Sequence, residues 1–253
     1  MKVKNDQYYK RRMQAQVGII RDMGYALDQQ SVVLDLGCGN GNLVHAYRKD
    51  GYQAYGCDFK FKDGPFVEEM HSQQVIRQIE SNSTDGTYRL PFADNSVDFL
   101  ISDMVFEHVK DYPSTLQEIS RVLKPGGISL HFFPSRYVPI EPHVFVPFAT
   151  IFQNYTWLKF WALLGIKTKE QRGLSAKEIA EKNYQYLTSQ TIYLTKSEIK
   201  AYCNRHFSKV RFCEDYFFRY IQRAPYLYQL SKVFFFLPSV YSTLKTRVLF
   251  FSK

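Results

Sequence analysis

The sequence predicts an α/β fold with a largely parallel sheet, and three apolar runs carry that prediction. Val32–Leu36 leads directly into the glycine-rich turn Gly37–Gly41. The run Ala54–Cys57 ends at the acid Asp58, and Val97–Ile101 follows a polar turn. Short apolar runs that alternate with helical patterns are typical of parallel strands that are buried on both faces. We therefore expect strands and helices to alternate along the first half of the chain.

The glycine-rich turn predicts where a cofactor binds. Only glycine combines a positive φ with room for a ligand to approach the backbone. A dinucleotide site requires Gly-x-Gly-x-x-Gly, but Asn42 stands at the third glycine position, so that pattern fails. An acid shortly before the first glycine instead suits a cationic ligand. A tight turn without a ligand is the alternative. The predicted contacts are Asp35, Gly37, Cys38, Gly39, Asn40 and Gly41.

The acid that ends the second apolar run predicts a ribose contact. In open α/β sheets, ligands bind at the carboxyl ends of the strands, and an acid about 20 residues beyond the glycine turn bonds the ribose hydroxyls. Asp58 stands at that place, with Phe59 beside it. Taken alone, Asp58 is better explained as a helix cap. In combination with the glycine turn, it favours cofactor binding.

Further blocks follow in a recognisable order. Leu90-Pro91-Phe92 precedes the apolar run at Val97, and Phe106-Glu107-His108 comes after it. A helix with Leu116, Ile119 and Val122 on one face then ends at Leu123-Lys124-Pro125-Gly126-Gly127, and Ile128–Phe133 predicts another strand. With the glycine turn, these blocks resemble the class I S-adenosylmethionine-dependent methyltransferases, in particular the small-molecule group called methyltransferase type 11. The resemblance covers about residues 30–135.

The resemblance implies a fold and a cofactor. The fold is a Rossmann-like seven-stranded sheet with helices on both faces and a helical insertion after the fifth strand. The cofactor is S-adenosylmethionine, with S-adenosylhomocysteine as the product. Ser102 and Asp103, at the end of the fourth strand, are expected to contact the cofactor. The third strand is expected at Val75–Ile79. The adenine contact is expected from Glu80, from Asp85, which is slightly preferred, or from backbone amides.

We expect one methyltransferase domain with four parts. Residues 1–30 form an N-terminal helical cover, because Tyr9, Met13, Val17 and Ile20 recur at helical spacing; a helix that covers only the sheet edge is equally compatible. Residues 30–135 form the cofactor-binding core, 136–205 a substrate-cap insertion, and 206–253 the C-terminal strands and helix. The last two strands are expected at 209–213 and 246–251.

The chemistry is expected in the loop after the fifth strand. Its prolines predict an extended, stiff segment. Histidine is the usual base near neutral pH, so His143, held by Glu141 or another acid, is the first catalytic candidate, and His108 is the second. Capping of the loop by His143 is the alternative. Arg136 and Tyr137 are predicted substrate contacts, His131 is expected to be a packed core histidine, and no metal is expected.

Composition limits the setting of the protein. The 253 residues carry a net charge of +9, and the four cysteines form no Cys-x-x-Cys pair. No signal peptide is evident, so we expect a cytoplasmic protein with reduced thiols. The apolar run at 225–238 is too short to span a bilayer. It predicts either a buried helix or peripheral contact with a membrane. Nucleic acid is disfavoured because no Pro-Pro-Tyr/Phe-like motif follows the fourth strand.

The sequence therefore predicts methyl transfer from S-adenosylmethionine to a small-molecule, glycan or lipid-linked acceptor, at oxygen. A non-catalytic S-adenosylmethionine-binding regulatory or partner protein is the alternative. The sequence does not indicate an oligomeric state.

Overall fold

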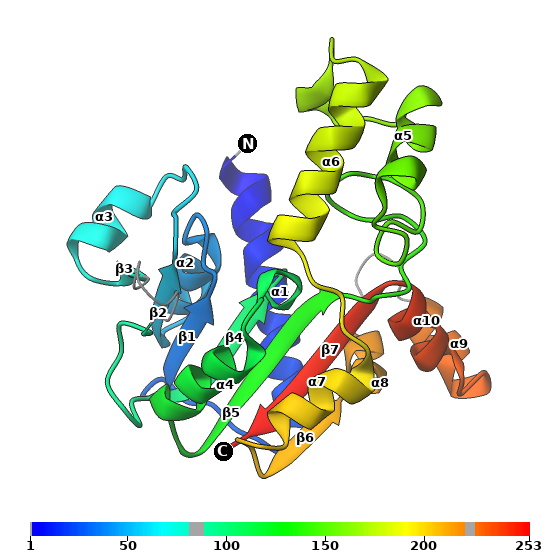
Figure 1. Cartoon of the computed structure of the whole chain (residues 1–253). Helices are drawn as coiled ribbons and strands as arrows, with labels where there is room; N and C mark the ends of the chain where they lie inside the picture. The colour runs from blue at the N-terminus through cyan, green and yellow to red at the C-terminus, as the bar shows by residue number, and fades with distance from the viewer. Residues whose placement is uncertain (1, 81–88, 221–225) are drawn as a thin grey trace.

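The computed structural model describes residues 2–80, 89–220 and 226–253 and has a seven-stranded sheet at its centre (Figure 1). The strand order is β3-β2-β1-β4-β5-β7-β6. The first five strands run parallel, and β7 is antiparallel to both β5 and β6. The strands are β1 (Val32–Leu36), β2 (Gln53–Asp58), β3 (Ile76–Gln78), β4 (Val97–Asp103), β5 (Leu123–Pro134), β6 (Lys209–Phe212) and β7 (Thr246–Ser252). This is the predicted Rossmann-like seven-stranded arrangement.

Helices cover both faces of the sheet and bury two separate apolar cores. The α1–α2 side packs Met13, Val33 and Phe99, whereas the α4–α7 side packs Leu34, Leu100 and Leu116. Figure 1 shows α4 and α7 in front of the sheet and α1 behind it. The helices of these layers are α1 (Lys2–Asp22), α2 (Asn42–Lys49), α3 (Val67–Ser72), α4 (Tyr112–Val122), α7 (Lys196–Cys203) and α8 (Glu214–Arg219).

The chain between β5 and α7 forms a third apolar core. Leu158 of α5 (Tyr155–Leu163) packs with Ala180 and Leu187 of α6 (Ala176–Gln190), and the short helix η2 (Lys169–Gln171) lies between them in sequence. Figure 1 shows α5 and α6 beyond the end of the sheet where β4 and β5 finish. By contrast, α7 packs against α4 and contributes to the core of the sheet. The separate structure after β5 therefore consists of α5 and α6.

Two expectations about local structure need correction. β5 begins at Leu123 rather than Ile128, because Leu123 pairs with Val97 and residues 124–127 bulge before Ile128 pairs with Phe99. β3 is shorter than expected and spans only Ile76–Gln78.

The apolar run at 225–238 does not form a buried helix. Its described part holds α9 (Tyr226–Val233) and the start of α10 (Leu237–Leu244), and no residue of α9 is buried. Phe235, between the two helices, is 88% exposed. The described helices include none that is both long and apolar enough to cross a membrane.

Candidate active site

The glycine turn at the end of β1 has the backbone conformation that its sequence predicts. Gly37, Gly39 and Gly41 all have positive φ, at 77°, 53° and 70°. A side chain at Gly37 would meet the Val105 methyl at 2.3 Å, so this glycine also permits close packing. The Gly37 amide donates to the carbonyl of Cys57 over 2.7 Å, which ties the turn to β2.

Asp58 lies at the carboxyl end of β2, directly against this turn. Its Oδ2 accepts a hydrogen bond from the Gly39 amide over 2.8 Å, and its Oδ1 accepts one from the Lys60 amide over 3.3 Å. A carboxylate has about four acceptor sites, so these two bonds leave capacity for hydroxyl groups. This geometry fits the ribose of a nucleoside cofactor.

Three acids near the turn create a site that suits a cation. Burial, together with the charges of Asp103 and Asp58, raises the pKa of Asp35 well above its ordinary value. Burial also raises the pKa of Asp103, although the ion pair with Arg12 opposes this shift. Arg12 comes from α1 and therefore brings that helix to the end of β4. A ligand with an ammonium and a sulfonium group would match this excess of carboxylates.

The other predicted cofactor residues differ in how far they are buried and in what they contact. Cys38 is buried, and Asn40 Oδ1 accepts a hydrogen bond from the Asn42 amide over 3.3 Å, whereas Phe59 is exposed. The Ser102 side chain is buried and bonds the Nδ1 of His131 over 2.7 Å, so a cofactor contact would be restricted to its main chain. Asp85 lies outside the described residues.

A second group of polar side chains lies where β4 and β5 end. Glu141 and His143, from the loop after β5, are joined by a 2.7 Å contact between Oε1 and Nδ1. Glu141 also accepts hydrogen bonds from the Tyr193 hydroxyl and from the amides of His143 and Val144. Burial raises the pKa of Glu141, but these donors outweigh it and hold the pKa below its ordinary value. Glu141 is therefore a buried carboxylate that fixes the His143 ring.

Glu107 and His108, which follow β4, complete this group. The rings of His108 and His143 lie 5.0 Å apart, and Nδ1 of His108 contacts the carbonyl of Gln190 at 2.7 Å. A carbonyl only accepts, so His108 Nδ1 carries the proton. The Glu107 side chain is fully buried, and burial raises its pKa to about 8. We call Glu107, His108, Glu141 and His143 the polar centre.

The polar centre adjoins the glycine turn. Val105 touches the turn at Gly37 and lies two residues before Glu107. Lys62 packs its side chain over Gly39, and its charge contributes to lowering the pKa of His108, after burial and the charge of His143. The cofactor turn and the predicted base therefore belong to one edge of the sheet. Arg136 instead pairs with Glu198 of α7 at 3.9 Å, and Tyr137 is exposed.

Several residues of this site were not predicted as candidates. Gln190 and Tyr193 reach the polar centre from the end of α6 and the segment after it, and Arg12 reaches Asp103 from α1. No local pattern marks them, because the contacts depend on how α1 and α6 pack. Glu107 could have been found because it directly precedes His108, but the sequence does not reveal that its side chain is buried.

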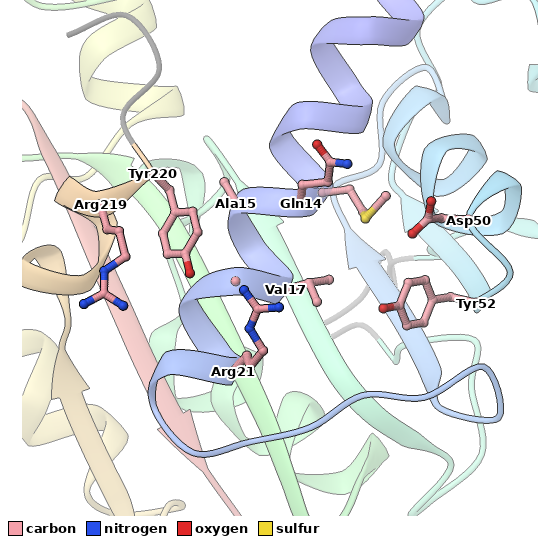
Figure 2. A pocket seen from close by; sticks show the side chains of 10 residues that line it. Gln14, Ala15, Val17, Arg21, Asp50, Tyr52, Arg219 and Tyr220 are labelled. Atoms are coloured by element: carbon pink, nitrogen blue, oxygen red, sulfur yellow. The ribbon is translucent and has the colours of Figure 1, made fainter. Parts of the chain in front are cut away.

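A cavity of about 530 Å³ lies elsewhere, along α1 (Figure 2). Figure 2 shows Arg219 and Tyr220 on one side of that helix and Asp50 and Tyr52 on the other. Tyr52 directly precedes β2, so one side of this cavity lies at the amino end of that strand. The glycine turn and the acids lie at the carboxyl ends, where ligands bind in such sheets. We therefore assign the chemistry to the carboxyl edge.

Comparison with known proteins identifies a family and relatives of this chain. A family model described as "Methyltransferase domain" matches residues 34–130. The chain is 30% identical over 176 residues to demethylmenaquinone methyltransferase of Bacillus licheniformis, covering 62% of this chain and 72% of the relative. It is 36% identical over 89 residues to malonyl-[acyl-carrier protein] O-methyltransferase 1 of Coxiella burnetii, covering 35% of this chain and 32% of that relative.

Among solved structures, the YcgJ protein of Bacillus subtilis has the same fold, with a TM-score of 0.50 at 15% identity, over 97% of this chain and 98% of that one. The match to the Bacillus licheniformis relative covers more than two thirds of that protein, and the turn and acids described above fit its class. This protein belongs to the class I S-adenosylmethionine-dependent methyltransferases.

Proposed function

We propose that this methyltransferase acts on an oxygen of a small-molecule, glycan or lipid-linked acceptor that binds between the glycine turn and the polar centre. The observation that supports this best is the half-buried His143 held by the buried Glu141, a pair that adjoins the cofactor edge of the sheet. The name of the Coxiella burnetii relative, an O-methyltransferase, is consistent with an oxygen acceptor.

The residues of the turn hold and orient the methyl donor in this proposal. S-adenosylmethionine supplies a methyl group on a sulfonium sulfur and leaves as S-adenosylhomocysteine. Asp58 offers its remaining acceptor sites to the ribose hydroxyls, and the glycines leave the backbone open to close approach. Asp103 provides negative charge for a cationic ligand, Asp35 can ionise once such a ligand is bound beside it, and α1, anchored by Arg12, covers the site.

The polar centre removes the proton of the acceptor. His143 Nδ1 donates to Glu141, so the Nε2 of the neutral ring is an acceptor. In the proposed step, the acceptor hydroxyl gives its proton to Nε2, its oxygen bonds to the methyl carbon, and the bond between sulfur and that carbon breaks. Glu141 stabilises the imidazolium that forms, as a carboxylate does for a catalytic histidine.

Replacement of the proposed base tests this function. His143→Ala should lower methyl-transfer turnover by about 100-fold or more, the usual contribution of a general base, while S-adenosylmethionine binding in calorimetry stays unchanged. His206→Ala, at the far end of α7, is the matched control and should behave as wild type. Unchanged turnover in His143→Ala would contradict the base role. Cofactor binding without turnover on any acceptor would favour the non-catalytic alternative.

A lipid-linked acceptor receives support from the exposed apolar surface. Phe234, Phe235 and Phe236 lie between α9 and α10 and are all exposed, and the exposed Lys232 lies two residues before Phe234. Aromatic side chains beside basic ones are typical of surfaces that bind anionic lipid headgroups. We propose that this segment, which we call the α9–α10 tip, rests on the membrane that carries the acceptor.

A further inference from the structure

We propose that Glu107, His108 and His143 bind one divalent metal ion of the imidazole-binding type, such as Zn²⁺, Mn²⁺ or Fe²⁺. The inference rests on the proposed function in one respect, namely that the acceptor binds at the polar centre. It changes how the polar centre would work, because it assigns His143 as a ligand rather than as a base.

The three side chains already converge. One carboxylate oxygen of Glu107 and one ring nitrogen from each histidine all lie within 4.8 Å of one another. His108 Nε2 is 4.0 Å from Glu107 Oε1. Ligand atoms at about 2.1 Å from a metal are about 3.0–3.4 Å apart in octahedral or tetrahedral sites. Side-chain adjustments of roughly an ångström would therefore complete the coordination.

Each histidine has, on its Nδ1, a partner of the kind that metal-ligating histidines have. A ligating histidine usually donates its other ring N–H to a carboxylate or a backbone carbonyl, which fixes the tautomer. His143 Nδ1 lies 2.7 Å from the Glu141 carboxylate, and His108 Nδ1 lies 2.7 Å from the Gln190 carbonyl. In each neutral ring, Nε2 is then the unprotonated nitrogen, and it is available to a metal.

The carboxylate of Glu107 supplies an independent indication. Its side chain has no exposed surface, and neither carboxylate oxygen accepts a hydrogen bond from any other described residue; only the backbone of Glu107 itself acts on its carboxylate. A buried polar group without a partner is costly, and native structures nearly always satisfy such groups by hydrogen bonds or ions. A cation between Glu107 and the two histidines would provide the missing partner.

The donor set indicates the kind of metal. Two imidazoles and one carboxylate suit Zn²⁺, Mn²⁺ and Fe²⁺, whereas Mg²⁺ and Ca²⁺ prefer oxygen ligands alone. Three protein ligands also leave coordination positions open for an acceptor oxygen. Coordination lowers the pKa of a bound hydroxyl, so its proton can pass to solvent water before the oxygen attacks the methyl carbon. The acceptor class would then be one with a metal-coordinating oxygen.

The test measures metal binding directly and methyl transfer separately. The untagged full-length protein is stripped with a chelator and titrated with Mn²⁺, Zn²⁺ or Mg²⁺ in equilibrium dialysis with elemental analysis. We expect one Mn²⁺ or Zn²⁺ per chain and much weaker binding of Mg²⁺. Glu107→Gln and His143→Ala should each weaken binding by at least about tenfold. His206→Ala is the matched control and should bind as wild type, and thermal unfolding checks that each variant is folded.

The outcomes separate this inference from the proposed function. If the stripped protein binds no Mn²⁺ or Zn²⁺ stoichiometrically, or if folded Glu107→Gln and His143→Ala bind them as wild type does, the metal site is refuted. Full methyl transfer by metal-free protein would also refute a catalytic metal and leave the proposed function intact. One bound metal, lost in the variants, with cofactor binding but no transfer to any acceptor, would support the site and refute the function.

Discussion

Asp35 shows how a single buried acid links the cofactor site to pH. Because the pKa of Asp35 is raised in the folded protein, the folded state keeps a proton that the unfolded state releases above the ordinary value of 3.8. The contribution of Asp35 to stability is therefore fully present below pH 3.8. It is lost as pH rises toward the raised value, by up to about 1.4 kcal/mol per pH unit.

Asp35→Asn should reduce the loss of stability that accompanies rising pH. We expect the free energy of unfolding of the variant, measured with urea without cofactor between about pH 4 and pH 8, to fall less steeply than that of wild type. The variant should also bind S-adenosylmethionine more weakly, because Asp35 can ionise beside the bound cation and asparagine cannot. Asp63→Asn removes an exposed carboxylate and is the control. Parallel pH profiles for Asp35→Asn and wild type would contradict this account.

Gly37 is required for two reasons that substitutions can separate. Gly37→Ala pays the left-handed backbone penalty of about 1–2 kcal/mol and also brings a methyl group to 2.3 Å from Val105. Gly24→Ala is the matched control, because Gly24 has a φ of 90° and no atom near its added methyl. We expect Gly37→Ala to lose about 1–3 kcal/mol more of the free energy of unfolding than Gly24→Ala. Equal losses in the two variants would show that packing against Val105 does not matter. If Gly37→Ala loses more, adding Val105→Ala to it should restore part of the extra free energy of unfolding that it lost.

At the residue level, the sequence indicated what lies close together along the chain. Glu141 and His143 are two residues apart in a stiff loop; the prediction was that Glu141 or another acid holds His143, and the contact with Glu141 is present. The partners Gln190 and Tyr193 lie 82 and 52 residues from the side chains that they contact, so no local pattern could reveal them. The burial of Glu107 likewise depends on packing that the sequence alone does not express.

At the level of elements, the strands of the core were the most predictable part. Each apolar run of the cofactor-binding half became a strand, because an alternating α/β chain has to bury such runs between helices. The start of β5 was not predictable, since the bulge before Ile128 follows from pairing with β4. The apolar run at 225–238 misled for a different reason. Apolar composition suggests burial, but no described residue packs over α9 closely enough to bury any of its side chains fully.

At the scale of the whole molecule, the polar centre joins the sheet to the core formed by α5 and α6. The sheet has an apolar core on each face, and α5 and α6 have a third with the segment around Val144. The amide of Ile192 donates to the carbonyl of Glu107 over 2.7 Å, so the chain leaving α6 is fixed to the end of β4. The contacts of His108 with Gln190 and of Glu141 with Tyr193 lie at the same junction. An acceptor or a metal bound there would therefore stabilise the position of α6 relative to the sheet.

The α9–α10 tip provides a test at the scale of the molecule and its surroundings. Phe235 is 88% exposed, and the chain as a whole carries a net charge of +9, so insertion of the aromatic ring and attraction to anionic headgroups should act together. We expect wild type to sediment with vesicles of anionic phospholipid and to be released by salt, because exposed charges are screened.

Phe235→Ser should bind such vesicles at least about threefold more weakly without loss of thermal stability, since burial of an aromatic side chain contributes more than 1 kcal/mol. Tyr184→Ser, which removes an exposed aromatic side chain from α6, is the control. If Phe235→Ser and wild type sediment equally, or neither sediments, the tip does not contact a lipid surface.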